Sequence, residues 1–245
     1  MSEAQLIEIF SSIQGEGLRL GEMQTFVRFQ GCSLRCRWCD TPENFNPKKN
    51  YRVEDLPFSG TWSEHPNSIS AEKLLQFLSH FKNTWVSFTG GEPLEQADFL
   101  EECLKIAPKH FRFLLETGGF LPGELERIIS YLHCVSMDIK LPSSTQTGEY
   151  WIQHGEFLKV AQRAPQFYVK MVLTEKTVEE ELQRALHLIA SINEKTPVIL
   201  QPVSAIKGFS EWVSIKKIAH FYQLSSQFKM PLKIIPQVHK GMGVN

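Results

Sequence analysis

From residue 70 to the C-terminus, the chain repeats one pattern: a short apolar segment precedes a longer segment with apolar residues every three or four positions. Short apolar segments are typical of buried strands, and the longer spacing is typical of amphipathic helices. Strands joined through helices have right-handed crossovers and form a parallel sheet. The expected strands are 85–89, 111–116, 135–139, 167–173, 198–203 and 232–235, and the expected helices are 97–107, 123–132, 148–163, 177–192 and 210–224. We therefore predict an α/β fold, a partial (β/α) barrel of about six parallel strands.

The first 80 residues are less regular. Residues 6–10 and 25–30 have the composition of strands. The polar, glycine-containing segment 11–17 between them is interpreted as a loop near a ligand. Residues 42–68 contain prolines and asparagines without a clear period, which predicts a long variable excursion of the kind that can cover a site. Ser70 is expected to cap a helix whose apolar stripe continues to residue 81.

Length and charge favour a single domain over residues 1–245 that acts on a small molecule. A chain of 245 residues, 42% of them hydrophobic, can bury one sizeable core. Its 26 basic and 27 acidic residues give a formal charge of -1 and no field suited to nucleic acid or an anionic membrane. There is no basic leader and no apolar run of about 18 residues. We therefore expect a cytoplasmic protein.

Three cysteines lie close together in one short segment, residues 31–41, which we call the cluster loop. Cys32, Cys36 and Cys39 are too close for all three to form disulfides with one another, and a structural zinc site normally has four ligands. A cubane iron–sulfur cluster bound by three cysteines keeps one iron open to another ligand. Cys103 and Cys134 lie alone in apolar segments and are interpreted as core residues in a reducing compartment.

A glycine-rich tetrapeptide, Gly90-Gly91-Glu92-Pro93, follows the expected strand 85–89. Glycines at a strand end allow close approach of the backbone to a ligand, although the same tetrapeptide is also a reasonable tight turn.

The cysteine spacing, the aromatic Trp38 before the last cysteine and the glycine-rich tetrapeptide together resemble the radical S-adenosylmethionine (SAM) superfamily. The resemblance implies a radical SAM core fold. It also implies a [4Fe-4S] cluster on the three thiolates, with SAM chelating the fourth iron. Reductive cleavage of SAM then yields a 5′-deoxyadenosyl radical.

Further segments are similar to the 7-carboxy-7-deazaguanine synthase family of queuosine and deazapurine biosynthesis. They are residues 12–17, Arg28, Cys39-Asp40-Thr41 and the segment 236–240. The resemblance implies a lyase that converts 6-carboxy-5,6,7,8-tetrahydropterin to 7-carboxy-7-deazaguanine by a radical ring contraction with loss of ammonia. It also implies Mg²⁺ and a C-terminal tail, about 236–245, that folds over the substrate.

The resemblance also assigns roles to individual residues. Arg28 suits the substrate carboxylate, because its planar guanidinium can donate two parallel hydrogen bonds. Thr41 provides a hard oxygen of the kind that Mg²⁺ prefers and is assigned as the metal ligand. The expected substrate contacts are Ile13, Gln14, Gly15, Glu16, Arg28, Thr89, Gln237, His239 and Asn245. The expected SAM contacts are Trp38, Cys39, Asp40, Gly90, Gly91, Glu92, Ser136, Met137, Asp138 and Gln201.

Two other functions are compatible with the cysteine loop. One is an enzyme that places a glycyl radical on a partner protein, and the other is a non-catalytic iron–sulfur or zinc module. The segment 14–17, Thr41 and the tail 237–240 argue against the first, and the second predicts no cleavage of SAM. As partners we expect the pterin acid, an external electron donor such as flavodoxin, and a second copy of the chain in a homodimer.

Overall fold

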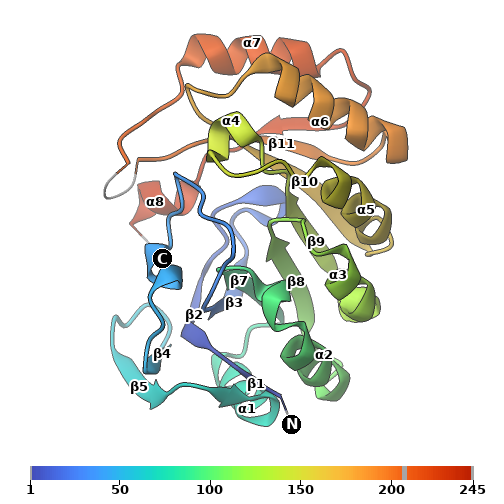
Figure 1. Ribbon diagram of the computed structural model, residues 1–245. Coiled ribbons are helices and arrows are strands. Elements are labelled where there is room, and N and C mark those ends of the chain that lie inside the picture. Colours follow the sequence, from blue (N-terminus) through green and yellow to red (C-terminus); the bar gives the residue numbers. More distant parts are fainter. Residues whose placement is uncertain (1, 206–208, 244–245) are drawn as a thin grey trace.

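The computed structural model describes residues 2–205 and 209–243, and its main element is one curved sheet (Figure 1). In the described residues this sheet has ten strands in the order β12-β11-β10-β9-β8-β7-β3-β2-β4-β5. Their bounds are β2 Leu6–Ile13, β3 Met23–Phe29, β4 Asn50–Glu54, β5 Trp62–Pro66, β7 Trp85–Gly90, β8 Arg112–Thr117, β9 Cys134–Asp138, β10 Gln166–Leu173, β11 Val198–Pro202 and β12 Leu232–Ile234. Strands β1 (Glu3–Ala4) and β6 (Ile69–Ser70) pair separately.

In this sheet β3, β7, β8, β9, β10, β11 and β12 all run parallel, as the repeated strand–helix pattern predicts. The helices are α1 Ala71–Phe81, α2 Ala97–Ile106, α3 Pro122–Ile128, α4 Pro142–Thr145, α5 Trp151–Ala161, α6 Glu179–Ile192, α7 Ile215–Ser225 and α8 Val238–Met242. Short 3₁₀ segments are Gly17–Arg19, Pro42–Phe45, Pro93–Gln96 and Ile129–Tyr131. Figure 1 shows α2, α3, α5 and α6 following one another along one face of the sheet. The partial barrel is thereby confirmed, with β12 and β5 as its unpaired edges within the described residues. None of the described helices has the length and apolar character needed to cross a membrane.

Helix α1 shows how the sequence produces these elements. The Ser70 hydroxyl accepts a hydrogen bond from the Lys73 amide at 3.3 Å and so satisfies one of the free N–H groups of the first turn. The apolar stripe, including Leu74 and Leu78, is buried against the sheet. The helix ends at Lys82, which adopts the left-handed conformation with φ 57°.

One expectation about the first 70 residues is wrong. Residues 11–13 belong to strand β2 and not to a loop, because Asn83 donates hydrogen bonds to the hydroxyls of Ser11 and Thr25 at 2.8 and 3.1 Å and satisfies these polar side chains inside the sheet. The excursion 42–68 contains two strands. Tyr51 and Val53 alternate with exposed residues in β4, which pairs parallel to β2, and β5 returns antiparallel to β4.

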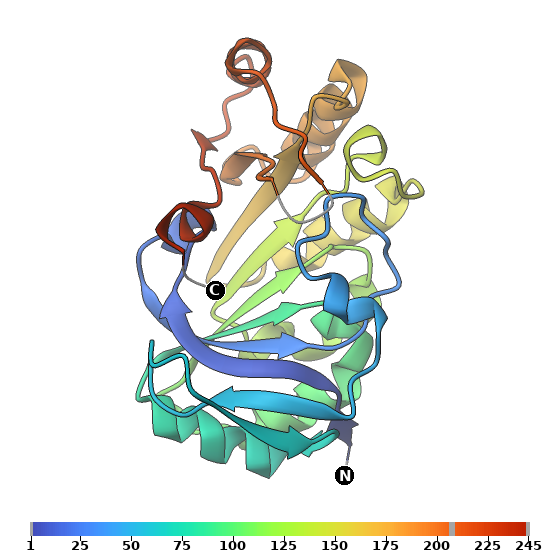
Figure 2. The same cartoon turned by 90° about the vertical axis from the view of Figure 1, so that its left-hand side faces the viewer.

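The topology brings distant segments to one edge of the sheet. The C-terminal ends of parallel strands meet at the same edge, so the cluster loop after β3 lies beside the glycines after β7. At the other side of the opening, Figure 2 shows α8 packed next to the turn between β2 and β3. The Val238 amide donates to the Gly15 carbonyl there at 3.0 Å.

Candidate active site

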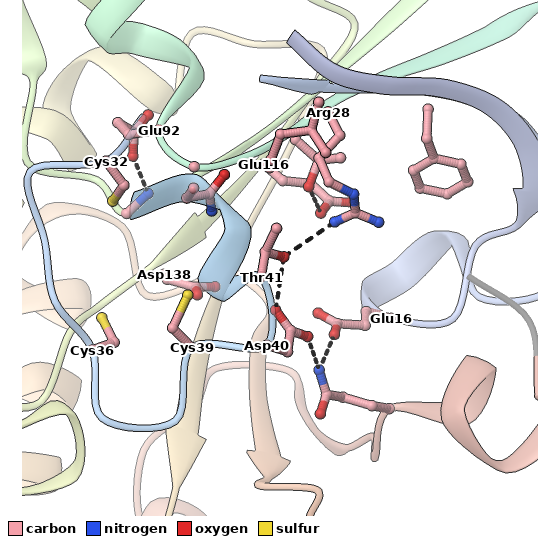
Figure 3. A pocket seen from close by; sticks show the side chains of 18 of the residues that line it. Glu16, Arg28, Cys32, Cys36, Cys39, Asp40, Thr41, Glu92, Glu116 and Asp138 are labelled. Carbon is pink, nitrogen blue, oxygen red and sulfur yellow. Dashed lines mark hydrogen bonds between the residues drawn. The ribbon is translucent and has the colours of Figure 1, made fainter. Parts of the chain in front are cut away.

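A cavity of about 550 Å³ lies at this edge of the sheet, enclosed by the cluster loop, the strand ends and the C-terminal tail (Figure 3). Nearly all of the residues predicted from the sequence line it. They are Ile13, Gln14, Gly15, Glu16, Arg28, Cys32, Cys36, Trp38, Cys39, Asp40, Thr41, Thr89, Gly90, Gly91, Glu92, Asp138, Gln201, Gln237 and His239.

The three thiols of the cluster loop are free and half-buried beside the cavity (Figure 3). Burial raises the pKa of all three, to about 12 for Cys32, where the Glu92 charge adds to the shift, and Lys140 opposes it at each thiol. A buried thiolate needs a strong cation close by, and the irons of a cluster supply one. The donor set and its surroundings therefore fit a [4Fe-4S] cluster held by Cys32, Cys36 and Cys39.

The glycine-rich tetrapeptide is packed directly on the start of the cluster loop. The Gly91 amide donates to the Phe29 carbonyl at 3.0 Å, and the Glu92 amide donates to the Gly31 carbonyl at 2.8 Å. A Cβ atom on residue 91 would lie 1.7 Å from the Gly31 oxygen, and residue 90 has φ 112°. Both positions therefore require glycine for contact between two backbone segments, in addition to any contact with a ligand.

Glu92 lies at the cavity wall but is 1% exposed, and its carboxylate binds one hydroxyl and two backbone amides. Its carboxylate accepts from the Thr117 hydroxyl at 2.8 Å, from the Gly118 amide at 2.7 Å and from the Leu94 amide at 3.2 Å. Burial raises its pKa to about 7, although these donors favour the charged form. The side chain predicted to contact SAM thus ties the end of β7 to the end of β8.

Arg28 lies between a buried acid and the predicted metal ligand. Its Nε donates to Glu8 at 2.8 Å, and its Nη1 lies 3.3 Å from the Thr41 hydroxyl (Figure 3). Glu8 also accepts from Arg52 Nε at 2.8 Å and Nη2 at 2.5 Å. The strand 25–30 indicated Arg28, but nothing in the sequence pointed to Glu8 or Arg52, because they meet only when β4 pairs with β2.

Glu116, at the end of β8, is a further cavity residue that the sequence analysis missed (Figure 3). It accepts hydrogen bonds from the Gln14 amide at 2.8 Å, from Ser87 at 3.2 Å and from Thr89 at 2.9 Å. It could have been found from the sequence, because it is an acidic residue near the end of an apolar strand, where sites are built in parallel sheets. Gln14 and Thr89, both predicted to contact the substrate, are thereby held by one carboxylate.

Alternating charges connect the turn after β2 to the cluster loop. Lys170 forms ion pairs with Glu16 and, at 3.4 Å, with Asp138, and Lys140 contacts Asp138 at 2.7 Å. Burial alone would lower the pKa of both lysines, but Asp138 and the other neighbouring acids outweigh it and raise each pKa above its usual value. The Lys140 ammonium also lies 4.9 Å from the centre of the Trp38 ring. Lys170 was not predicted, although a lysine inside the apolar segment 167–173 could have indicated it.

The C-terminal tail is fastened to both sides of the cavity mouth. The Gln237 amide donates to Glu16 at 2.7 Å and to Asp40 at 3.1 Å, and Lys240 contacts Asp40 at 3.2 Å. Burial would raise the pKa of Asp40, but Lys240 and Arg28 lower it below its usual value. The tail therefore connects the β2–β3 turn with the cluster loop.

His239 packs directly on the β2–β3 turn. A Cβ atom on Gly15 would lie 2.2 Å from its Nδ1 atom, so only glycine leaves room for the ring. His239, Glu16 and Asp40 also bring one possible ligand atom each within 4.8 Å of one another. The Asp40 carboxylate lies 3.3 Å from the Thr41 hydroxyl, which adds a further hard oxygen next to this group.

Two predicted residues, Ser136 and Met137, do not line the cavity. Ser136 and Met137 are buried below it, because Met137 points to the other side of β9 and packs against Gly119, and Ser136 hydrogen-bonds Tyr168 within the sheet. Asn245 lies outside the described residues. Gln201, by contrast, lines the cavity, and its buried Oε1 has no hydrogen-bond partner among the described residues. An unpartnered acceptor of this kind fits a ligand that donates a hydrogen bond.

Comparisons with known proteins agree with the motifs. The sequence model of the Radical SAM superfamily matches residues 26–189. A 7-carboxy-7-deazaguanine synthase of Geobacter sulfurreducens is 35% identical over 246 residues, covering 98% of this chain and 97% of the relative. Another, of Methanothermobacter thermautotrophicus, is 31% identical and covers 100% of this chain and 99% of the relative.

Among solved structures, the crystal structure of QueE from Escherichia coli matches with a TM-score of 0.54 at 20% identity, covering 94% of each chain. This likeness shows the fold. The resemblance predicted from the cysteine and glycine motifs is thus confirmed by full-length relatives. The chain belongs to the radical SAM superfamily and, within it, to the 7-carboxy-7-deazaguanine synthase family.

Proposed function

We propose that this chain converts 6-carboxy-5,6,7,8-tetrahydropterin to 7-carboxy-7-deazaguanine by a radical ring contraction with loss of ammonia. The observation that carries the proposal is one continuous cavity. Three free thiols line one part of it, and the guanidinium of Arg28 lines another. SAM and a small carboxylic acid can therefore bind in contact with each other, which a hydrogen-atom transfer between them requires.

The cofactor part of the cavity is built from the cluster loop and the ends of β7, β9 and β11. Cys32, Cys36 and Cys39 would hold a [4Fe-4S] cluster, which together with SAM would supply a 5′-deoxyadenosyl radical. Gly90 and Gly91 present backbone at the cavity wall, Asp138 offers a carboxylate, and Gln201 offers its unpartnered carbonyl. We assign these residues to the orientation of SAM.

The substrate part is built from the β2–β3 turn, β3 and β8. Arg28 has N–H groups on the edge facing away from Glu8 that can bind the substrate carboxylate. Glu116 is an acceptor next to Gln14 and Thr89, so this group suits the N–H donors of a pterin ring. Glu16 and the tail residue Gln237 cover the opposite side, where they limit the access of water.

We assign Mg²⁺ to Thr41, with Asp40 as its negatively charged neighbour. The hydroxyl of Thr41 is buried, and the adjacent carboxylate offers a second hard oxygen at 3.3 Å. Mg²⁺ binds few protein oxygens and keeps positions for water and substrate oxygens, which suits a pair of donors at a cavity wall.

An external reductant such as flavodoxin would supply the electron. The two remaining cysteines, Cys103 and Cys134, are buried at 0% and 1% exposure in the core and provide no second redox centre near the cluster loop. A homodimer and a cytoplasmic location stay predictions.

The test is anaerobic reconstitution followed by mass spectrometry of the products. The protein is supplied with iron and sulfide, then with dithionite, SAM, Mg²⁺ and the pterin acid. We expect 5′-deoxyadenosine and 7-carboxy-7-deazaguanine together. 5′-Deoxyadenosine without the deazaguanine would remove the substrate assignment and favour another radical reaction, such as activation of a partner protein. The absence of both would indicate a non-catalytic module.

A further inference from the structure

The hairpin formed by β4 and β5 contributes a second arginine to the cavity. Arg52 pairs with Glu8 in the register of β4 and β2, and both residues line the cavity. Its guanidinium lies 4.1 Å from the centre of the Trp62 ring on β5, which fixes its plane. Strand β4 thus carries Arg52, and strand β5 orients its guanidinium through Trp62.

Glu8 is the shared partner of two guanidiniums. It is 5% exposed, and one carboxylate oxygen accepts from Arg28 while the other accepts from Arg52. Arg28 and Glu8 alone would form a neutral pair, which attracts an anion weakly. Addition of Arg52, whose side chain is 46% exposed at the cavity wall, makes the group of three a net cation, and a net cation attracts a carboxylate.

The geometry leaves donors free for such an anion. Each arginine uses its Nε edge for Glu8, and Arg28 directs Nη1 toward Thr41 at 3.3 Å. In residues 2–205 and 209–243, no side chain accepts a hydrogen bond from Nη1 of Arg52 or from Nη2 of Arg28. Two planar donors held by one acid can bind the two oxygens of one carboxylate.

We propose that Arg52 is a specificity-determining residue, which together with Arg28 forms a two-arginine site for the substrate carboxylate, with Glu8 as the positioning residue of both. The inference rests on the proposed function, since it names the group that the pterin acid would meet. It gives the excursion 42–68 a role in selecting a carboxylated pterin over an uncharged one.

The test measures binding rather than turnover. Anaerobic calorimetry of the reconstituted protein with SAM present compares 6-carboxy-5,6,7,8-tetrahydropterin with its 6-methyl analogue. We expect the wild type to prefer the acid and Arg52→Gln to weaken binding of the acid about tenfold, which corresponds to about 1.4 kcal/mol, because the variant loses a hydrogen bond between two charged groups. Binding of the methyl analogue should change less than about twofold. Arg163→Gln, which removes an exposed arginine from an ion pair with Glu126, is the matched control and should bind both like the wild type.

Two further variants keep the result interpretable if Arg52→Gln folds poorly. Arg52→Lys keeps the charge and should lose less affinity for the acid, and Trp62→Leu frees the guanidinium and should lower the preference without changing the charge. A wild type that binds the acid no better than the methyl analogue would overturn the substrate assignment itself. A wild-type preference that persists undiminished in Arg52→Gln and Trp62→Leu would overturn the role of Arg52 alone.

Discussion

Lys170 is paired with two carboxylates in one cavity wall, so its removal should destabilise the fold. Its side chain is 8% exposed, and those of Glu16 and Asp138 are each 15% exposed. Loss of one partner of a buried ion pair costs about 3–5 kcal/mol, because the remaining charge is left without compensation. Both acids are slightly exposed, and Asp138 keeps Lys140 as a second partner. We therefore expect Lys170→Met to lower the free energy of unfolding by about 3 kcal/mol, near the lower limit of this range.

Urea unfolding of the reconstituted protein under anaerobic conditions at pH 7.5, followed by tryptophan fluorescence, measures this loss. Lys176→Met, which removes a lysine with a half-exposed side chain, is the control and should leave the unfolding midpoint unchanged. Glu16→Gln added to Lys170→Met removes the unbalanced charge and keeps an oxygen for Gln237, so the double variant should be more stable than Lys170→Met. A loss below about 1 kcal/mol, or a double variant no more stable than Lys170→Met, would refute charge compensation as the reason for Lys170.

Three further predictions concern pH, the cluster loop and the tail. His154 accepts from the Lys140 amide and donates to the Gly119 carbonyl, and burial lowers its pKa to about 4. The unfolded chain therefore takes up a proton first as the pH falls. Between pH 7.5 and pH 4 the free energy of unfolding of the wild type should fall by about 3 kcal/mol relative to that of His154→Gln, and the two profiles should run parallel above pH 7.5; profiles that are parallel throughout would exclude this. Gly91→Ala should lower the iron bound per chain, because its Cβ would displace the Gly31 carbonyl at the start of the cluster loop. Gly123→Ala, whose Cβ would meet nothing within 4 Å, is the control, and equal iron contents would contradict a role of the Gly91–Gly31 contact in cluster binding. Gln237→Leu should raise the KM for the pterin acid about fivefold and leave the Kd for SAM unchanged, and an equal effect on both would show that the tail does not act on the substrate side.

The parallel part of the fold was predictable because its signals are local. Each strand from 85–89 onward is a short apolar segment followed by an amphipathic one, so the pattern within about 25 residues determines both elements. The cluster loop and Gly90-Gly91 were also predictable, because all three thiols lie in one loop and both glycines lie at one strand end. The hydrogen bonds of Glu92 could not be predicted from its motif, because their donors, Thr117 and Gly118, lie at the end of the next strand, β8.

The missed features all depend on contacts between distant segments. Arg52 lies 44 residues from Glu8, and no local pattern shows that β4 pairs with β2. Lys170 meets Glu16 across 154 residues. Alternation along β9 directs Asp138, but not Met137, into the cavity, and Ser136 lies deeper on the same side, so the contacts of Ser136 and Met137 with SAM stay predictions.

In the proposed reaction, one cavity brings the radical derived from SAM to a ring carbon of the pterin acid. The most direct measurement uses 6-carboxy-5,6,7,8-tetrahydropterin deuterated at its saturated ring carbons, turned over anaerobically, with mass spectrometry of the 5′-deoxyadenosine formed. We predict 5′-deoxyadenosine that contains deuterium, formed together with 7-carboxy-7-deazaguanine. Unlabelled 5′-deoxyadenosine released in the presence of the deuterated acid would contradict the account.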